Sequence, residues 1–175
     1  MIQTILFATD LCVFTPYLLR HVSDLCQRWG AKAVLVHAVE PLGILGTAVV
    51  NTYLPAQIGR EFNEHGLETL LVSIKERLID LLADEMLSGE EGVAVIKDVQ
   101  VTLGRPDDVI LQTIADCSAD LVVLGSHSPD RHGYAELGSV AMRVMQHSKI
   151  PVYLVPLSAQ SPAMQDQHSR FADLR

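Results

Sequence analysis

The sequence predicts an α/β fold in which a doubly wound, five-stranded parallel sheet is flanked by helices. Two observations predict it: short, nearly continuous apolar runs recur along the 175 residues, and amphipathic helical segments separate them. Parallel strands covered on both faces read as apolar runs, and each needs a crossover to its neighbour. Because such crossovers are right-handed, helices cover both faces of the sheet.

The first elements alternate in this way from the N-terminus. Residues 2–8 are an apolar run rich in β-formers that stops at Thr9 and Asp10, which predicts a strand. Apolar residues between Leu18 and Cys26 recur three and four positions apart, as on one face of a helix, and Gly30 marks its end. Residues 33–39 predict the second strand.

The pattern continues through the rest of the chain. Residues 67–87 predict a long helix with one leucine-rich stripe, and residues 93–101 predict the third strand. A helix over residues 106–115 has Pro106 in its first turn, and Asp107 and Asp108 suit the positive end of its dipole. The remaining elements are a strand over 121–124, a helix over 137–147 and a strand over 151–155.

Two segments fall outside the alternation. Residues 41–55 form a long apolar connection with several glycines and prolines, at the end of the sheet where ligands bind. We expect either a lid or interaction surface, or a loop packed on its own domain or on a sister subunit. Residues 158–175 are polar and predict a tail or a short docked helix, so residues 1–157 form the single domain.

Composition excludes several classes of function. With 13 basic and 21 acidic side chains the net charge is −8, which argues against general nucleic-acid binding. Aromatic residues make up only 5%, too few for a base-stacking platform. No apolar stretch approaches the roughly 18 residues of a membrane-spanning helix, so we expect no membrane insertion.

The N-terminus and the cysteines indicate a cytoplasmic protein. The first ten residues lack the basic and cleavage regions of a signal peptide. Cys12, Cys26 and Cys117 are odd in number and form no C-x-x-C pair, so neither a disulfide framework nor a zinc site is expected. Free thiols of this kind are typical of a reducing compartment.

The stretch richest in chemistry joins the fourth strand to the last helix. The strand runs into Gly125, small and polar residues follow, and the helix opens at Gly138 and Ser139. Glycines let a backbone approach a ligand, and the N–H groups and dipole of a helix start favour an anion. This stretch therefore predicts a phosphate cradle, although a plain tight connection has the same pattern. Ligands of such folds bind beyond the carboxyl ends of the strands.

Residues 1–157 resemble the universal stress protein family, the UspA-like domain. The matching pieces occur in order along the chain: ILFATD at 5–10, LVHAVEP at 35–41, GRP at 104–106, ADLVVLGSH at 119–127, GSV at 138–140 and IPVYLV at 150–155. The resemblance implies a Rossmann-like fold, similar to the adenine nucleotide alpha hydrolases, with strand order 3-2-1-4-5. It also implies a homodimer that pairs through the edge strand from Pro151 to Val155.

Family members that bind ATP or a related adenine nucleotide carry the motif G-x2-G-x9-G-[ST]. Here Gly125, Gly138 and Ser139 keep its frame, and Ser128 replaces the second glycine. At positive φ this serine costs roughly 1–2 kcal/mol, which weakens binding about tenfold. At negative φ, which Pro129 favours, the cradle keeps its backbone.

The resemblance carries the nucleotide contacts onto this chain residue by residue. The adenine and ribose would lie near the end of the first strand, where Asp10 accepts a hydrogen bond from a ribose hydroxyl, and beside the ends of the second and fourth strands. The residues implied for adenine and ribose are Ala8, Thr9, Asp10, Ala38, Leu124 and Gly125. Those implied for the phosphates are His127, Ser128, Gly138, Ser139 and Val140. Mg²⁺ bound with ATP, or the nearby Arg131 and Arg143, would offset phosphate charge.

Other interpretations of single residues stay open. Asp10 also suits a plain turn after the strand, and His37 suits a hydrogen-bonded core position. A metal site at His127 and His132 is not expected, because no third ligand is evident. Neither is a hydrolytic triad of Ser126, His127 and Asp130, since near-neighbours on one loop seldom point at one another.

The resulting hypotheses belong to different classes. The first is a cytoplasmic stress-response or signalling module that binds ATP or AMP. The alternative is a nucleotide-free interaction protein in which residues 125–139 are structural only. Enzymatic turnover, at most a slow ATP hydrolysis, ranks last because no residue is an evident general base.

Overall fold

The computed structural model describes residues 1–12, 14–41, 43, 66–87, 95–126 and 137–157. It contains one parallel sheet of five strands in the order β3-β2-β1-β4-β5, which confirms the predicted fold class and strand order. The strands are β1 (Thr4–Ala8), β2 (Lys32–Val39), β3 (Ile96–Leu103), β4 (Leu121–Gly125) and β5 (Val152–Val155). The helices are α1 (Thr15–Trp29), α4 (Leu67–Leu87), α5 (Pro106–Asp116) and α6 (Ser139–His147).

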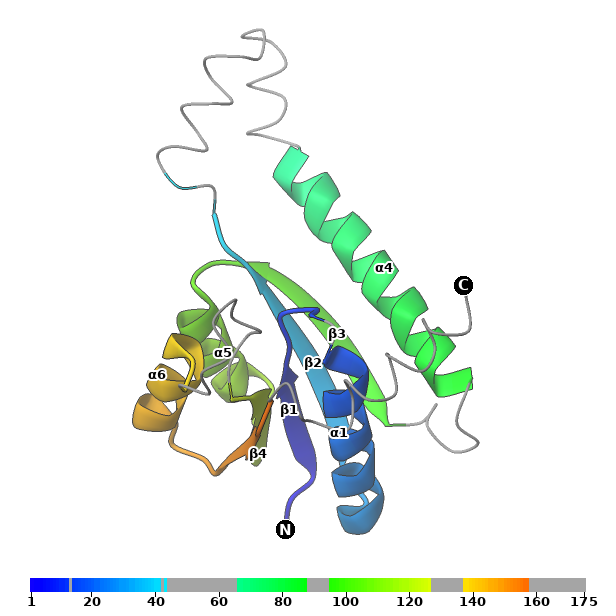
Figure 1. Cartoon of the computed structure of the whole chain (residues 1–175), viewed down its shortest axis with the longest axis vertical. Coiled ribbons are helices and arrows are strands. Elements are labelled where there is room, and N and C mark those ends of the chain that lie inside the picture. The colour runs from blue at the N-terminus through cyan, green and yellow to red at the C-terminus, as the bar shows by residue number, and fades with distance from the viewer. Residues whose placement is uncertain (13, 42, 44–65, 88–94, 127–136, 158–175) are drawn as a thin grey trace, which may run out of the picture.

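Helices cover both faces of the sheet, as the crossover rule requires. Helices α1 and α4 lie on one face, and α5 and α6 lie on the other (Figure 1). The side chains of β1 alternate accordingly. Ile5 and Phe7 join a cluster with Leu18 of α1 and Leu78 of α4, whereas Leu6 joins the cluster under α5 and α6. The central strands β1, β2 and β4 therefore bury both of their faces, which is why they read as continuous apolar runs, whereas the edge strands β3 and β5 are more exposed.

The strand register brings three chain segments to one edge of the sheet. Ala8 of β1 pairs with Val36 of β2, and Phe7 pairs with Val123 of β4. Because these neighbours are parallel, the residues that follow each strand emerge side by side. Thr9 extends this order by one residue, since its N–H donates to the carbonyl of Val36 at 3.1 Å.

Element boundaries differ from the sequence prediction by a few residues. Strand β3 extends to Leu103 rather than residue 101, because it pairs with β2 as far as Val39. Helix α6 begins at Ser139, since Gly138 is extended with φ −60° and ψ 146°. Predicted residues 93–94, most of the 41–55 connection and the 158–175 tail lie outside the described residues.

A carboxylate anchors the start of the first strand. Asp120 accepts hydrogen bonds from the backbone N–H groups of Gln3 at 2.7 Å and Thr4 at 3.0 Å. These bonds hold the pKa of the Asp120 carboxyl below its usual range. They join residues more than a hundred positions apart and fix the beginning of β1 beside β4.

The three cysteines are free thiols. Burial, together with the neighbouring Asp10, raises the pKa of Cys12 to about 12, and burial raises that of Cys26 to about 11. In the described ranges no group of three or more His, Cys, Asp or Glu side chains is placed to hold a metal ion. Nor is any helix within those ranges long and apolar enough to cross a membrane.

Candidate functional site

A pocket of about 340 Å³ lies at the carboxyl edge of the sheet, where β1, β2 and β4 end and where α5 and α6 begin. This volume falls within the usual range for small-molecule sites, about 300–1,000 Å³. The residues around it come from segments far apart in sequence. They are Ala8, Thr9, Asp10, Leu18, Val36, His37, Ala38, Glu40, Pro106, Ile110, Leu124, Gly125, Gly138, Ser139, Val140, Ala141 and Leu157.

The structure brings together the predicted site residues that it describes. Those predicted for adenine and ribose, from the ends of β1, β2 and β4, all line the pocket. So do Gly138, Ser139 and Val140, which were predicted for the phosphates. The other two, His127 and Ser128, lie outside the described residues, as does Arg131.

The turn after β1 holds its shape through its own side chains. Thr9 Oγ1 lies 2.9 Å from Thr15 Oγ1 and accepts a hydrogen bond from the N–H of Leu11 at 3.1 Å. Leu11 has a left-handed backbone, with φ 59°. Asp10 Oδ1 accepts from the N–H of Cys12 at 3.1 Å. Asp10 thus acts as a turn residue and also lines the pocket, so its two interpretations are compatible.

His37 forms the hydrogen bond that its place in an apolar strand predicted. Its Nδ1 lies 2.9 Å from the carbonyl oxygen of Thr9. Because a carbonyl only accepts, Nδ1 carries the hydrogen. This bond ties the end of β2 to the turn after β1. His37 is only half-buried, however, and it lines the pocket rather than lying in the core.

Ser126 holds the segment after β4 through three hydrogen bonds with backbone groups, two from its own backbone and one from its hydroxyl. Its N–H donates to Val155 at 2.8 Å, and its carbonyl accepts from Gly138 at 2.8 Å. Its hydroxyl oxygen accepts from the N–H of Leu157 at 3.0 Å. A Cβ on the preceding Gly125 would lie 2.5 Å from a methyl carbon of Leu157. A glycine at 125 therefore lets Leu157 close that side of the pocket.

The first turn of α6 presents backbone N–H groups at the pocket. Gly138 is its N-cap, and within the part of the chain that the structure describes no side-chain hydrogen bond caps this helix start. Ser139, Val140 and Ala141, the first residues of the helix, all line the pocket. An uncapped helix start combines unsatisfied N–H groups with the positive end of the helix dipole, which together favour an anion.

Local sequence signals missed several lining residues. Glu40 and Pro106 line the pocket and lie in the pieces LVHAVEP and GRP, but neither was predicted as a site residue. Leu18, Ile110 and Leu157 are ordinary apolar residues that only the packing of α1, α5 and the chain after β5 brings to the site. No periodicity distinguishes such residues from the core.

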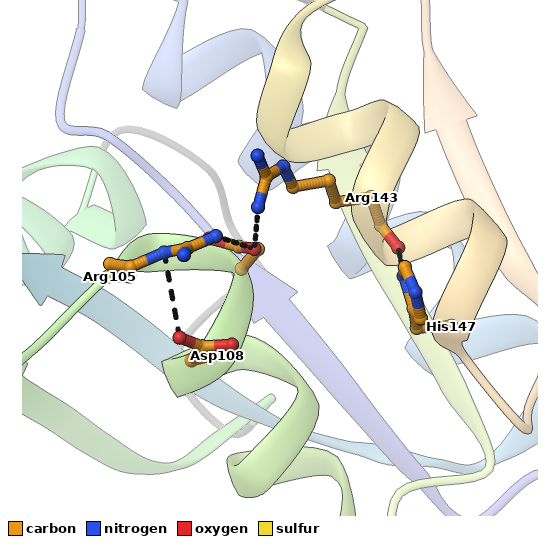
Figure 2. Close-up of polar contacts among 5 residues, drawn as sticks. Arg105, Asp108, Arg143 and His147 are labelled. Carbon is orange, nitrogen blue, oxygen red and sulfur yellow. Dashed lines mark hydrogen bonds and ion pairs between the residues drawn. The ribbon is translucent and has the colours of Figure 1, made fainter.

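Arg143, a candidate for offsetting phosphate charge, pairs with an acidic side chain beside the pocket and is not among the lining residues. Its Nη1 donates to Asp107 Oδ2 at 3.3 Å, and Arg105 Nη2 donates to the same oxygen at 2.7 Å (Figure 2). Burial raises the pKa of Asp107, but the hydrogen bonds from Arg105, its own backbone N–H and Arg143 outweigh that effect and leave the pKa lowered. Asp107 is therefore ionised at neutral pH.

The pocket is chemically divided. Ala8, Val36, Ala38, Ile110 and Leu124 supply an apolar strip. Two acidic side chains, Asp10 and Glu40, also line it, and the α6 helix start supplies N–H donors. An apolar strip suits a flat heterocycle, carboxylates accept from hydroxyl or amino groups, and a helix start suits an anion.

The chain is similar to known proteins over most of its length. A model of the universal stress protein family matches residues 1–156. A universal stress protein of Thermus aquaticus is 30% identical over 156 residues, which cover 89% of this chain and 99% of that protein. The solved structure of the Methanocaldococcus jannaschii protein MJ0577 matches with a TM-score of 0.66 and 22% identity, covering 90% of this chain and 98% of that one. A universal stress protein crystallised with cAMP matches with a TM-score of 0.55 and 20% identity over 90% of this chain and 98% of that one.

Proposed function

The chain belongs to the universal stress protein family, and from that premise we propose that it binds an adenine nucleotide, AMP or ATP, as a cytoplasmic stress-response or signalling module. One observation carries the proposal. A single pocket joins an apolar strip, two carboxylates and an uncapped helix start. These three features match, in turn, the base, the sugar hydroxyls and the phosphate of a nucleotide. The related protein crystallised with cAMP supports this choice of ligand class.

The proposed pose follows from the chemistry of the lining. Adenine lies against Ala8, Ala38 and Leu124, where apolar atoms cover its faces. The ribose lies beside Asp10, whose carboxylate accepts from a hydroxyl group. The phosphate meets the backbone at Gly138 and Ser139, which both line the pocket. Backbone N–H groups supply positive potential that the net charge of −8 does not count.

Binding, rather than turnover, is the proposed output. For ATP, Mg²⁺ would accompany the triphosphate and offset its charge, since it usually binds through phosphate oxygens and a few carboxylates. Hydrolysis of ATP would be slow at most. The nucleotide then acts by stabilising one arrangement of the residues around the pocket.

Calorimetric titration of the full chain with AMP and with ATP plus Mg²⁺ tests the proposal. Analysis of the supernatant after denaturation shows whether a nucleotide copurifies. Ser139→Ala removes a hydroxyl at the helix start, and Ser148→Ala, beyond the opposite end of α6, is its matched control. We expect AMP binding at least about tenfold weaker for Ser139→Ala and unchanged for Ser148→Ala, because only the first variant loses a hydrogen bond to a charged group.

A clean supernatant and no heat with either nucleotide would overturn the proposal. The chain would then be a nucleotide-free interaction protein, in which residues 125–139 are structural only. Equal weakening by the two serine variants would instead place the phosphate away from the start of α6.

We further propose a homodimer that pairs through the β5 edge. Strand β5 is the last in the sheet order, and Tyr153 on it is 36% exposed. An edge strand offers unpaired backbone groups to a second copy. Sedimentation velocity at micromolar concentration should show a dimer that Tyr153→Asp dissociates. Met142→Asp, at an exposed apolar residue of α6, is the control. A monomer in the unmodified chain would refute this pairing.

A further inference from the structure

Three charged side chains join the two helices that flank one side of the pocket. Asp107 lies in the first turn of α5, and its side chain is only 11% exposed. Arg105 directly before α5 and Arg143 in the second turn of α6 both donate to its Oδ2, at 2.7 Å and 3.3 Å. Figure 2 shows the two guanidinium groups converging from their separate elements. We refer to Asp107 and Arg143 as the α5–α6 ion pair.

Both residues of this ion pair lie next to, or one helical turn from, a residue that lines the pocket. Pro106, which precedes Asp107, lines the pocket, and so does Ser139, one helical turn before Arg143. Neither Asp107 nor Arg143 is among the lining residues. Deeper in the structure, Ile110 of α5 shares an apolar cluster with Ala141 of α6. Arg143 lies two residues after Ala141, so the ion pair adds a polar contact to this apolar packing near the two helix starts.

Asp107 is mostly buried and Arg143 is half exposed, and such an ion pair adds little net stability, because solvent screens the attraction and desolvation of the carboxylate offsets it. Its geometry is demanding, however, since a buried carboxylate requires its hydrogen-bond partners to stay in place. Arg105 and Asp107 are two residues apart, so their contact is local to the start of α5. Of the two contacts of Asp107 with arginines, the one with Arg143, 36 positions away, links one helix to the other.

We propose that Asp107 and Arg143 are positioning residues whose ion pair holds the first turn of α6 against α5, and so fixes where the Gly138–Ser139 helix start meets a phosphate. This inference rests on the proposed function. Without the pair, the helix start keeps its N–H groups but loses one of the contacts that set its position. A phosphate then meets donors that are less well placed, while a base and sugar at the sheet edge are unaffected.

Positioning by the ion pair and simple charge effects predict opposite changes in AMP binding when Asp107 is neutralised. Asp107→Asn removes a negative charge and leaves two guanidinium groups nearby, so charge alone would strengthen binding of an anion. Arg143→Met keeps the aliphatic stem but removes a positive charge, so charge alone would weaken it. If the pair positions α6, both substitutions weaken binding of AMP.

The test is calorimetric titration of the full chain with AMP and with adenosine, which lacks the phosphate. For Asp107→Asn and Arg143→Met we expect AMP to bind about fivefold more weakly, and adenosine within about twofold of the unmodified chain, as suits a partly exposed ion pair. The double variant should bind AMP no more weakly than either single variant. Arg105→Gln, which leaves the α5–α6 pair intact, is the matched control and should change AMP binding by less than about twofold.

Tighter AMP binding by Asp107→Asn, or an equal loss for adenosine and AMP, would overturn the inference. Amide hydrogen exchange in the ligand-free chain tests it independently of the proposed function. The N–H of Met142 donates to the Gly138 carbonyl at 2.9 Å in the first turn of α6. Its exchange should be about fivefold faster in Asp107→Asn than in Arg105→Gln, as expected from local opening. Equal exchange would overturn the inference, and absence of binding by the unmodified chain would refute only the proposed function.

Discussion

Gly104 is the position where an added methyl group should cost the fold most. Its φ is 154°, a conformation that L side chains rarely adopt. A Cβ built there would lie 2.8 Å from Cγ2 of Val109, which is buried in the cluster under α5 and α6. The N–H of Gly104 also donates to the carbonyl of Val39 at 2.9 Å, which ties the turn between β3 and α5 to the end of β2.

Gly104→Ala combines backbone strain with overpacking. Strained backbone costs about 1–3 kcal/mol, and forcing a methyl group into a packed core costs about 1–3 kcal/mol. We therefore expect the free energy of unfolding to fall by about 2–6 kcal/mol. For a chain of this length that corresponds to a drop in Tm of about 4–24 °C. The measurements are urea denaturation followed by circular dichroism and a thermal melt.

Gly30→Ala is the matched control, because it carries the strain without the clash. Gly30 has φ 64° at the end of α1, and nothing lies within 4 Å of a Cβ built there. The expected loss is about 1–2 kcal/mol. In the double variant Gly104→Ala/Val109→Ala, removal of the valine methyl groups should recover about 1 kcal/mol or more relative to the sum of the single effects. If Gly104→Ala costs no more than Gly30→Ala and shows no coupling to Val109, the reasoning is refuted.

Three further predictions concern single polar groups. The hydrogen-bonded Asp120 has a lowered folded-state pKa, so its stabilising effect is complete above the unfolded pKa of about 3.9 and is lost as pH falls through the folded value. Asp120→Asn should therefore unfold in less urea than the unmodified chain at pH 7, and the difference should shrink as pH falls below the unfolded pKa of about 3.9; a difference unchanged at low pH would contradict this. Burial raises the pKa values of Cys12 and Cys26 to about 12 and 11, so little thiolate is present at pH 8. Both should react with iodoacetamide at pH 8 about a hundredfold more slowly than glutathione, as followed by mass spectrometry. Rates comparable to that of glutathione would show that these thiols are not protected by burial. Ser126→Ala removes the acceptor for the N–H of Leu157 and should lower the free energy of unfolding by about 1–2 kcal/mol in urea titrations. An unchanged free energy of unfolding would contradict a stabilising role for this hydrogen bond.

Hydrophobic periodicity predicted the fold because the central strands are buried on both faces and the helices pack one face on the sheet. The runs at β1 and β4 could not be solvent-exposed, and the spacing of apolar residues from Leu18 to Cys26 placed one face of α1 on the sheet. Boundaries were less accurate where pairing decides them. Strand β3 ends at Leu103 because its neighbour β2 continues to Val39, which the sequence of β3 does not reveal.

The site residues that the sequence predicted share one feature. They lie at the carboxyl end of a strand, directly after a strand, or at the start of a helix. Asp10, Ala38, Gly125 and Ser139 could be placed at one edge because parallel strands end together. By contrast, Leu157 lies beyond β5, and it reaches the pocket through its hydrogen bond to Ser126 and the space that Gly125 leaves. No local pattern encodes such a contact.

The sequence by itself determined the α/β class, the positions of the strands and helices, and the segment that forms the α6 helix start. These properties depend on local periodicity, on glycine and proline, and on the geometry of parallel strands. Only the tertiary structure decided that Arg143 pairs with Asp107, and that His37 lines the pocket while bonding to Thr9. The physical reason is that a charge or hydrogen-bond donor takes the partner that packing brings within reach, and packing joins residues whose separation in sequence carries no signal.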